Sequence, residues 1–263
     1  MRFALNHILA PGQSLPAFFA MARGLGCTEV EIRNDLSDAP IQNGIPAAEV
    51  ARAAQAAGVE ILTINALYPF NLWSPEMQTK TESLARYAAE AGAKALVMCP
   101  LNEGPRVDNQ SLVTALAQIR PILRDHGLTG LVEALGFPRS SLRTKTEAVA
   151  AIRAVGGEDT YKLVHDTFHH TLAEETALYP DLTGLVHISG VVDPTLTLAT
   201  MEDEHRVLID AQDRLNNVGQ IQNLIAAGYS GPFSFEPFSP AVQALPDPTA
   251  ALSTSMAYLR QSL

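Results

Sequence analysis

The sequence is poor in cysteine and has no long hydrophobic run. Its 263 residues include only two cysteines, Cys27 and Cys99, which provide neither a disulfide framework nor a paired zinc-binding motif. No stretch of about 18 apolar residues runs without a polar interruption, so we expect no membrane span. Asn6 and His7 break the amino-terminal apolar run, which argues against a secretory signal. These absences predict a cytoplasmic protein with both cysteines reduced.

Positive charge is also scarce. The chain has 18 Lys and Arg residues against 28 Asp and Glu residues, for a formal net charge of −10. Affinity for nucleic acids comes from basic side chains that neutralise phosphates, so this balance argues against a nucleic-acid partner. Small neutral or weakly charged substrates fit the composition better.

Eight short apolar runs follow one another at regular intervals along the chain. They are residues 3–9, 29–34, 60–67, 95–101, 130–135, 162–168, 184–190 and 231–238. Such runs are typical of buried parallel strands. Segments with helical spacing begin between them at Ser14, Pro46, Ser74 and Ser111, and several end on glycine, as helix caps do. The repeated unit is therefore a strand followed by a helix.

Eight such units in about 250 residues predict one (β/α)₈ TIM barrel, with residues 1–263 as a single domain. The alternative is a doubly wound sheet. Its nucleotide-binding form is disfavoured because no GxGxxG motif follows the first apolar run. The long irregular stretch at 190–217 is a candidate functional loop, since ordered loops of this length often carry function.

Each of the last four apolar runs closes on a carboxylate or an imidazole. These residues are Glu133, Asp166, His187 and Glu236. Burying four such groups without partners is costly, so we expect them to converge on one divalent cation at the carboxyl ends of the strands. Three carboxylates and one imidazole suit Mn²⁺, Mg²⁺, Co²⁺ or Zn²⁺. Taken singly, each glutamate could instead pair with an arginine, and the histidine could be an ordinary core residue.

At these positions the chain resembles the xylose isomerase-like TIM barrels, which include ketose 3-epimerases, hydroxypyruvate isomerases and inosose isomerases. The resemblance covers nearly the whole chain and rests on the series Glu133, Asp166 with His169 in HDTFH, His187 in VHIS, and Glu236 in SFEPF. It implies one divalent metal ion held by Glu133, Asp166, His187 and Glu236, with His169 as a catalytic residue near the substrate or metal-bound water. It also implies a polyol or keto-sugar substrate and favours a homo-oligomer.

The segments VMCPLNEG, EALGFP and VHISGV look most like those of inosose isomerases. Ketose 3-epimerases and hydroxypyruvate isomerases have a further glutamate six residues after the fifth-strand ligand, where this chain has Arg139. The family also has an arginine in the loop after the seventh strand. Arg214, in DRLNNVGQI, is our candidate for this substrate-binding arginine, and Arg206 is the alternative.

Three further residues are candidates for substrate binding. Arg33 ends the second apolar run and could bind substrate oxygens or pair with a rim carboxylate. His7 follows the first run and could line the site or make a structural hydrogen bond. Trp73 follows the third run and could shield the site from water or pack under a helix.

A metal beside titratable groups suits proton transfer next to a carbonyl through an enediolate. Glu133 and Glu236 are the candidate bases, and a keto-inositol is the expected substrate. The alternatives within the family are ketose 3-epimerisation and hydroxypyruvate-type isomerisation. An endonuclease IV-like hydrolase shares this barrel but needs more histidines and a basic surface. A sugar-binding barrel without catalysis is the third alternative.

Overall fold

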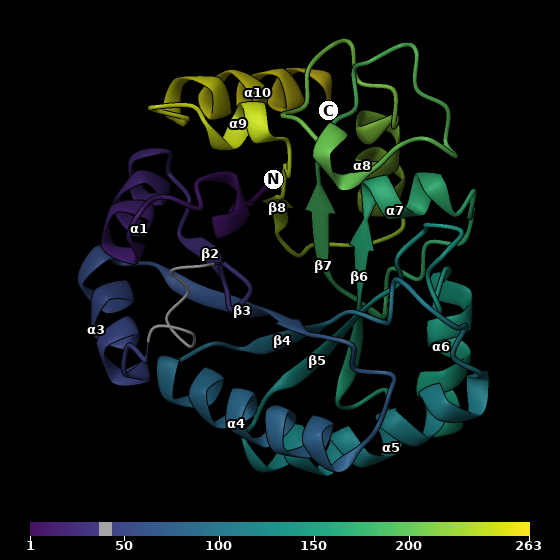
Figure 1. Ribbon diagram of the computed structural model, residues 1–263. Helices are drawn as coiled ribbons and strands as arrows, with labels where there is room; N and C mark the ends of the chain where they lie inside the picture. The colour runs from purple at the N-terminus through teal and green to yellow at the C-terminus, as the bar shows by residue number, and fades with distance from the viewer. Residues whose placement is uncertain (37–43) are drawn as a thin grey trace.

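Eight parallel strands close into a barrel in the computed structural model, which describes residues 1–36 and 44–263 (Figure 1). Each strand pairs with the next along the chain, and β8 pairs with β1. The strands are β1 (Phe3–Asn6), β2 (Glu29–Arg33), β3 (Glu60–Leu67), β4 (Ala95–Met98), β5 (Thr129–Glu133), β6 (Tyr161–Asp166), β7 (Thr183–Ile188) and β8 (Phe233–Phe235). The predicted TIM barrel is confirmed, and the closed circuit of pairing excludes the doubly wound sheet.

Helices surround the barrel and follow the strands in alternation (Figure 1). They are α1 (Leu15–Gly24), α3 (Ala47–Ala57), α4 (Pro75–Ala91), α5 (Asn109–Asp125), α6 (Lys145–Ala154), α7 (Thr167–Leu172), α8 (Asn217–Ala226), α9 (Pro240–Gln243) and α10 (Thr249–Ser262). Two short 3₁₀ helices, η1 (His7–Leu9) and η2 (Asp203–His205), lie in the loops. Among the described residues, none of these helices is long and apolar enough to cross a membrane.

Capping residues in the sequence explain where several helices begin. The Ser74 side chain accepts a hydrogen bond from the Met77 amide and starts α4, as an N-cap serine should. The structure differs from the sequence prediction at α5, which begins at Asn109, two residues before Ser111. The reason is that the Asp108 carboxylate accepts from the Ser111 amide and therefore takes the N-cap position itself.

The barrel interior combines an apolar cluster with buried polar side chains. Its apolar part is a small cluster formed by Ala95, Val97, Leu131, Val164 and Leu185. The strand side chains that point away from the barrel interior pack against the helices in a larger hydrophobic cluster. This alternation follows from the two-residue period of a strand. It leaves the polar inward-facing residues near the carboxyl ends of the strands.

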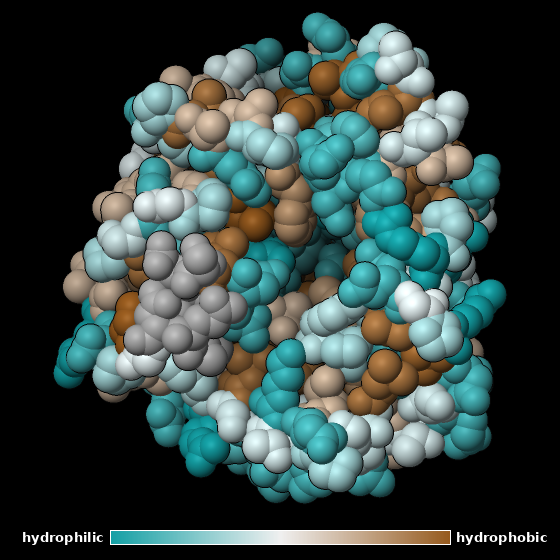
Figure 2. Space-filling view, in the orientation of Figure 1, coloured by the Kyte–Doolittle hydropathy of each residue, from teal (hydrophilic) through white to brown (hydrophobic). Residues whose placement is uncertain are grey.

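The predicted irregular stretch 190–217 forms a long ordered loop between β7 and α8. Val191, Met201 and Leu215 from this loop pack against Phe137 and Phe168 in a separate buried cluster. Gly190 and Val207 also form an antiparallel bridge. These contacts fix the middle of the loop, including η2, over the barrel. Figure 2 shows a hollow in the centre of this face, with both hydrophilic and hydrophobic residues at its rim.

One glycine after β5 lets two segments near the barrel mouth approach closely. A Cβ atom on Gly136 would lie 2.1 Å from the carbonyl oxygen of His169 and 2.9 Å from the amide nitrogen of Ala173. A side chain at this position must therefore displace either the β5–α6 loop or α7.

We predict that Gly136→Ala lowers the free energy of unfolding by about 3 kcal/mol, because overpacking against backbone cannot relax cheaply. Urea denaturation followed by circular dichroism measures this change. Gly12→Ala is the control, since nothing lies within 4 Å of a Cβ atom there. Equal stability of the two variants would contradict the prediction.

Candidate metal centre

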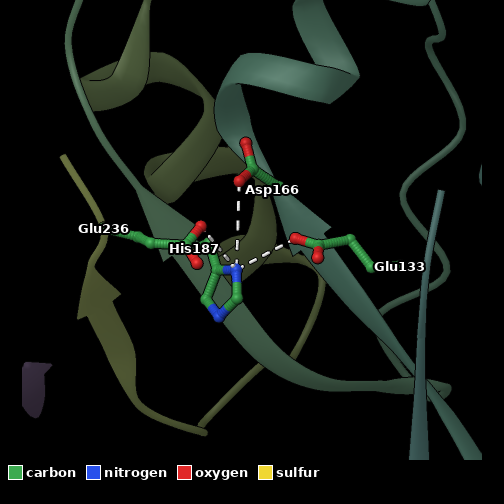
Figure 3. Close-up of side chains that lie close together, drawn as sticks. All are labelled: Glu133, Asp166, His187 and Glu236. Carbon is green, nitrogen blue, oxygen red and sulfur yellow. Dashed lines mark hydrogen bonds and ion pairs between the residues drawn. The ribbon is translucent and has the colours of Figure 1, made fainter. Parts of the chain in front are cut away.

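Four residues predicted from separate strands meet at the mouth of the barrel. Glu133 ends β5, Asp166 ends β6, His187 lies near the end of β7, and Glu236 follows β8. Each residue is less than 5% exposed. One ligand atom from each lies within 4.8 Å of the others. Figure 3 shows the three carboxylates directed at one nitrogen of the His187 ring.

The Nδ1 atom of His187 is the centre of this arrangement. It lies 3.0 Å from Glu133 Oε1, 3.0 Å from Glu236 Oε2 and 3.9 Å from Asp166 Oδ2. Burial by itself lowers the pKa of His187, but the surrounding carboxylates outweigh burial and raise this pKa well above its usual value. A proton on Nδ1 therefore occupies the position from which a metal ion would bind the ring.

A fourth carboxylate contacts His187, and it was not among the residues predicted from the sequence. It belongs to Glu31 on β2. It is fully buried, and both of its oxygens lie 3.1 Å from the other ring nitrogen of His187, Nε2. Burial raises the pKa of Glu31, but His187 and neighbouring hydroxyl groups outweigh it and bring the pKa to about 2. The available signal was an acidic residue inside the apolar run EVEIRN, where a charge needs a buried partner.

Two arginines contact the carboxylate cluster. The Nη2 atom of Arg206 donates to Asp166 Oδ2 at 2.6 Å and to Glu236 Oε2 at 3.0 Å. Its guanidinium is 1% exposed as a side chain and lies 5.1 Å from the ring centre of Phe168. Arg33 donates from Nη1 to Glu236 Oε1 at 3.0 Å and forms a second ion pair with Asp35. Arg33 thus contacts both a candidate ligand and a rim carboxylate.

The structure places Arg214 outside this cluster. Its guanidinium donates to the carbonyl oxygens of Asp193 and Leu196 within the long loop. Arg206, the alternative in the sequence, is the arginine of this loop that contacts Asp166 and Glu236. The sequence alone could not separate the two arginines, because contacts formed on folding, such as the bridge between Gly190 and Val207, bring residue 206 back over the barrel.

The remaining candidates lie around the centre or in its walls. His169 is 4% exposed and packs edge-on against Phe137, with ring centres 5.1 Å apart. His7 is buried, and its Nε2 atom hydrogen-bonds the Gln13 carbonyl at 3.0 Å. Trp73 is partly buried and packs against the main hydrophobic core. For His7 and Trp73, these contacts match the structural alternatives considered for the sequence.

The charges of the buried cluster suit a divalent cation. Among the described residues, Glu31, Glu133, Asp166 and Glu236 supply four carboxylates, while Arg33 and Arg206 supply two guanidinium groups. With His187 neutral, the sum of four negative and two positive charges is −2. Three carboxylates and an imidazole are also the donor set expected for Zn²⁺, Mn²⁺, Co²⁺ or Mg²⁺. The residues present therefore fit such an ion.

Comparisons with known proteins agree with this architecture. The sequence profile described as xylose isomerase-like TIM barrel matches residues 19–262. None of the curated proteins compared matches the chain. Among solved structures, a xylose isomerase domain containing protein from Salmonella typhimurium LT2 is 36% identical, with a TM-score of 0.91 over 99% of this chain and 96% of that chain.

More distant structures share the fold. The IolI protein, solved with a zinc atom, is 19% identical with a TM-score of 0.86 over 100% of this chain and 99% of that chain. A D-psicose 3-epimerase, solved in the presence of D-fructose, is 17% identical with a TM-score of 0.70 over 100% of this chain and 99% of that chain.

The proton on His187 should be displaced when a metal ion binds. We expect divalent metal binding near pH 7 to release about one proton per ion, because the metal must replace the Nδ1 proton. Calorimetric titration with Zn²⁺ in buffers of different ionisation enthalpy measures this number. Release of close to zero protons per Zn²⁺ ion would contradict the presence of a proton on Nδ1 of His187.

The same pKa shift sets the pH dependence of the metal-free protein. The folded pKa of His187 is raised, so its contribution to stability is complete below the unfolded pKa of about 6.5 and is lost as pH rises through the folded pKa. We expect the metal-free protein to lose stability at alkaline pH and Zn²⁺ to restore it. Thermal unfolding with and without a chelator tests this expectation.

Substitution of Arg206 tests whether this arginine neutralises the buried carboxylates. Arg206→Ala leaves Asp166 without its buried arginine and leaves Glu236 with Arg33 alone, so we expect the metal-free protein to lose about 3–5 kcal/mol of stability. Arg214→Ala, at an exposed arginine in the same loop, should change stability by less than about 0.5 kcal/mol. Urea denaturation in the presence of a chelator compares them. Similar losses for both variants would show that Arg206 does not neutralise the cluster.

Proposed function

The chain belongs to the xylose isomerase-like TIM barrel family, and we propose that it is a divalent-metal-dependent isomerase acting on a keto-inositol. The reaction moves a proton next to a carbonyl through an enediolate. The observation that carries this proposal is the convergence of three carboxylates and one imidazole nitrogen within 4.8 Å at the barrel mouth.

Two observations support a small polyhydroxylated substrate. Hydrophilic residues form part of the rim of the hollow in the centre of the face shown in Figure 2. The buried arginines are already paired with carboxylates, so no unpaired buried guanidinium among the described residues calls for an anionic substrate. The segments VMCPLNEG, EALGFP and VHISGV favour a keto-inositol within this class. The likeness to IolI, which was solved with a zinc atom, supports Zn²⁺ as a candidate ion.

A bound divalent cation would polarise the substrate carbonyl and acidify the neighbouring C–H group. A carboxylate then takes the proton from that carbon, and the electron pair of the C–H bond forms the carbon–carbon double bond of the enediolate. Return of that proton to the former carbonyl carbon, with transfer of the hydroxyl proton to the former carbonyl oxygen, completes the migration of the ketone. The chain must therefore provide one carboxylate that is free enough to accept a proton.

Glu133 suits the role of base better than Glu236. Glu236 accepts hydrogen bonds from Arg33, Arg206 and Asn6. Burial raises the pKa of Glu236, but His187 and the two arginines outweigh burial and bring it to about 2. The Oε2 atom of Glu133 accepts only a thiol hydrogen bond from Cys99, at 3.2 Å, among the described residues. We therefore assign proton transfer to Glu133 and metal binding to both glutamates.

Other residues would hold the substrate. The Nδ1 atom of His169 is buried without a hydrogen-bond partner among the described residues, and a substrate hydroxyl would supply one. Arg33 and Arg206 keep Glu236 and Asp166 in place beside the reacting carbons. The aromatic rings of Phe168 and Phe238 lie against the Arg206 guanidinium and help to exclude water from it.

Ketose 3-epimerisation is the alternative reaction. In that subfamily a further glutamate stands where this chain has Arg139. Here Arg139 lies over the Phe137 ring and forms an ion pair with Glu202 from the long loop, with contacts of 2.6 and 2.8 Å. This position therefore supplies a cation bound to a rim carboxylate instead of a second proton-transfer group.

Deuterium exchange tests the proposal. Metal-stripped protein is incubated with 2-keto-myo-inositol in deuterated water, with and without Mn²⁺ or Zn²⁺, and deuterium next to the ketone is followed by mass spectrometry. We expect metal-dependent exchange, and we expect Glu133→Gln at saturating metal to lower its rate by about 100-fold or more, as loss of a general base does. Glu82→Gln, an exposed change on α4, is the control.

The outcomes separate the alternatives. Exchange with open-chain ketoses, but not with the inosose, would replace the proposed reaction by epimerisation or aldose–ketose isomerisation. Tight metal binding without exchange on any of these substrates would favour a non-catalytic sugar-binding barrel.

A further inference from the structure

We propose that Glu31 is a positioning residue that keeps the Nε2 proton on His187 and thereby makes Nδ1 the atom that binds the metal ion. This inference rests on the metal centre of the proposed function, but it does not depend on the substrate.

Glu31 is surrounded by groups that donate hydrogen bonds. Its Oε2 atom accepts from Thr63 Oγ1 at 2.6 Å and from Asn65 Nδ2 at 2.9 Å. Its Oε1 atom accepts from Ser234 Oγ and, at 3.4 Å, from Asn6 Nδ2. The amide nitrogens of asparagine can only donate. Thr63 Oγ1 also accepts from Asn65 Nδ2, which leaves its own hydrogen for Glu31.

These donors fix the direction of the contact with His187. A carboxylate whose two oxygens already accept four hydrogen bonds has no proton to donate to the ring. Nε2 lies 3.1 Å from both oxygens, so it must be the donor. The ring then keeps its proton on Nε2 when Nδ1 loses its own, and the Nδ1 lone pair faces Glu133 and Glu236 at 3.0 Å.

The contacts also explain why Glu31 is no metal ligand itself. Its oxygens face Nε2, whereas Glu133, Asp166 and Glu236 face Nδ1 on another edge of the ring. Its donors come from three other strands, β1, β3 and β8. Strand register places Asn6 and Thr63 beside Glu31 and Ser234 beside His187. Glu31 thus hydrogen-bonds both to neighbouring strands and to the imidazole ring, and it orients the ring as carboxylates that contact metal-binding histidines do.

The decisive experiment measures metal affinity and the protonation of His187, neither of which requires turnover. We expect Glu31→Gln to weaken Zn²⁺ binding by about 10- to 100-fold in competition with a chromophoric chelator. In the Zn²⁺-loaded wild-type protein, long-range ¹H–¹⁵N correlation should show Nε2 protonated and Nδ1 bound to the metal. In the variant we expect loss or broadening of the Nε2–H signature.

Glu29→Gln is the matched control. Glu29 lies two residues earlier on the same strand and pairs with the exposed Arg2 at 2.9 Å, away from His187, so its change should leave Zn²⁺ affinity within about twofold of wild type. Glu31→Asp keeps the charge but shortens the reach to Nε2, and we expect an intermediate affinity. This variant provides the comparison if Glu31→Gln does not fold.

Unchanged Zn²⁺ affinity in both Glu31 variants, or Zn²⁺ on Nε2 in the wild-type protein, would overturn the inference. Absence of Zn²⁺ binding to the wild-type protein would overturn it as well. Zn²⁺ on Nδ1 with weakened binding in the variants supports it even if no keto-inositol exchange is found, in which case only the proposed reaction fails.

Discussion

The burial of negative charge at the barrel mouth is the constraint on which the rest of the site depends. Four carboxylates lie almost out of contact with water around one imidazole. Removing a carboxylate from water costs several kcal/mol unless cations and hydrogen bonds compensate for it. Arg33, Arg206 and a proton on His187 provide part of this compensation in the metal-free protein. A divalent ion that replaces the proton would complete it.

The two arginines reach the cluster by different routes. Arg33 belongs to the barrel itself, at the end of β2. Arg206 comes from the long loop after β7 and is held there by a bridge, by a buried apolar cluster and by a hydrogen bond from Nε to Ser189 at 2.9 Å. The stability of the site is therefore linked to the folding of this loop. A rearrangement of the loop that withdraws Arg206 would leave Asp166 and Glu236 buried without it.

The imidazole divides the polar end of the barrel into two regions. Glu31 and its donors lie on the Nε2 side, while three carboxylates face Nδ1. One region holds the ring in place, and a metal ion bound in the other would replace the Nδ1 proton. Glu133 differs from Glu236 within the second region because no arginine contacts it among the described residues. This difference underlies the proposed division between base and ligand.

The sequence by itself determined the barrel and four members of the site, because strand periodicity and strand order place Glu133, Asp166, His187 and Glu236 at one end of a parallel barrel. It did not identify Glu31, whose role depends on donors from β1, β3 and β8 that meet it only after the barrel closes. Nor could it choose between Arg206 and Arg214, eight positions apart in one loop. Tertiary structure shows that Glu31 contacts His187 and that Arg206 contacts the carboxylates, because the partners of a buried charge are set by contacts between segments distant in the chain.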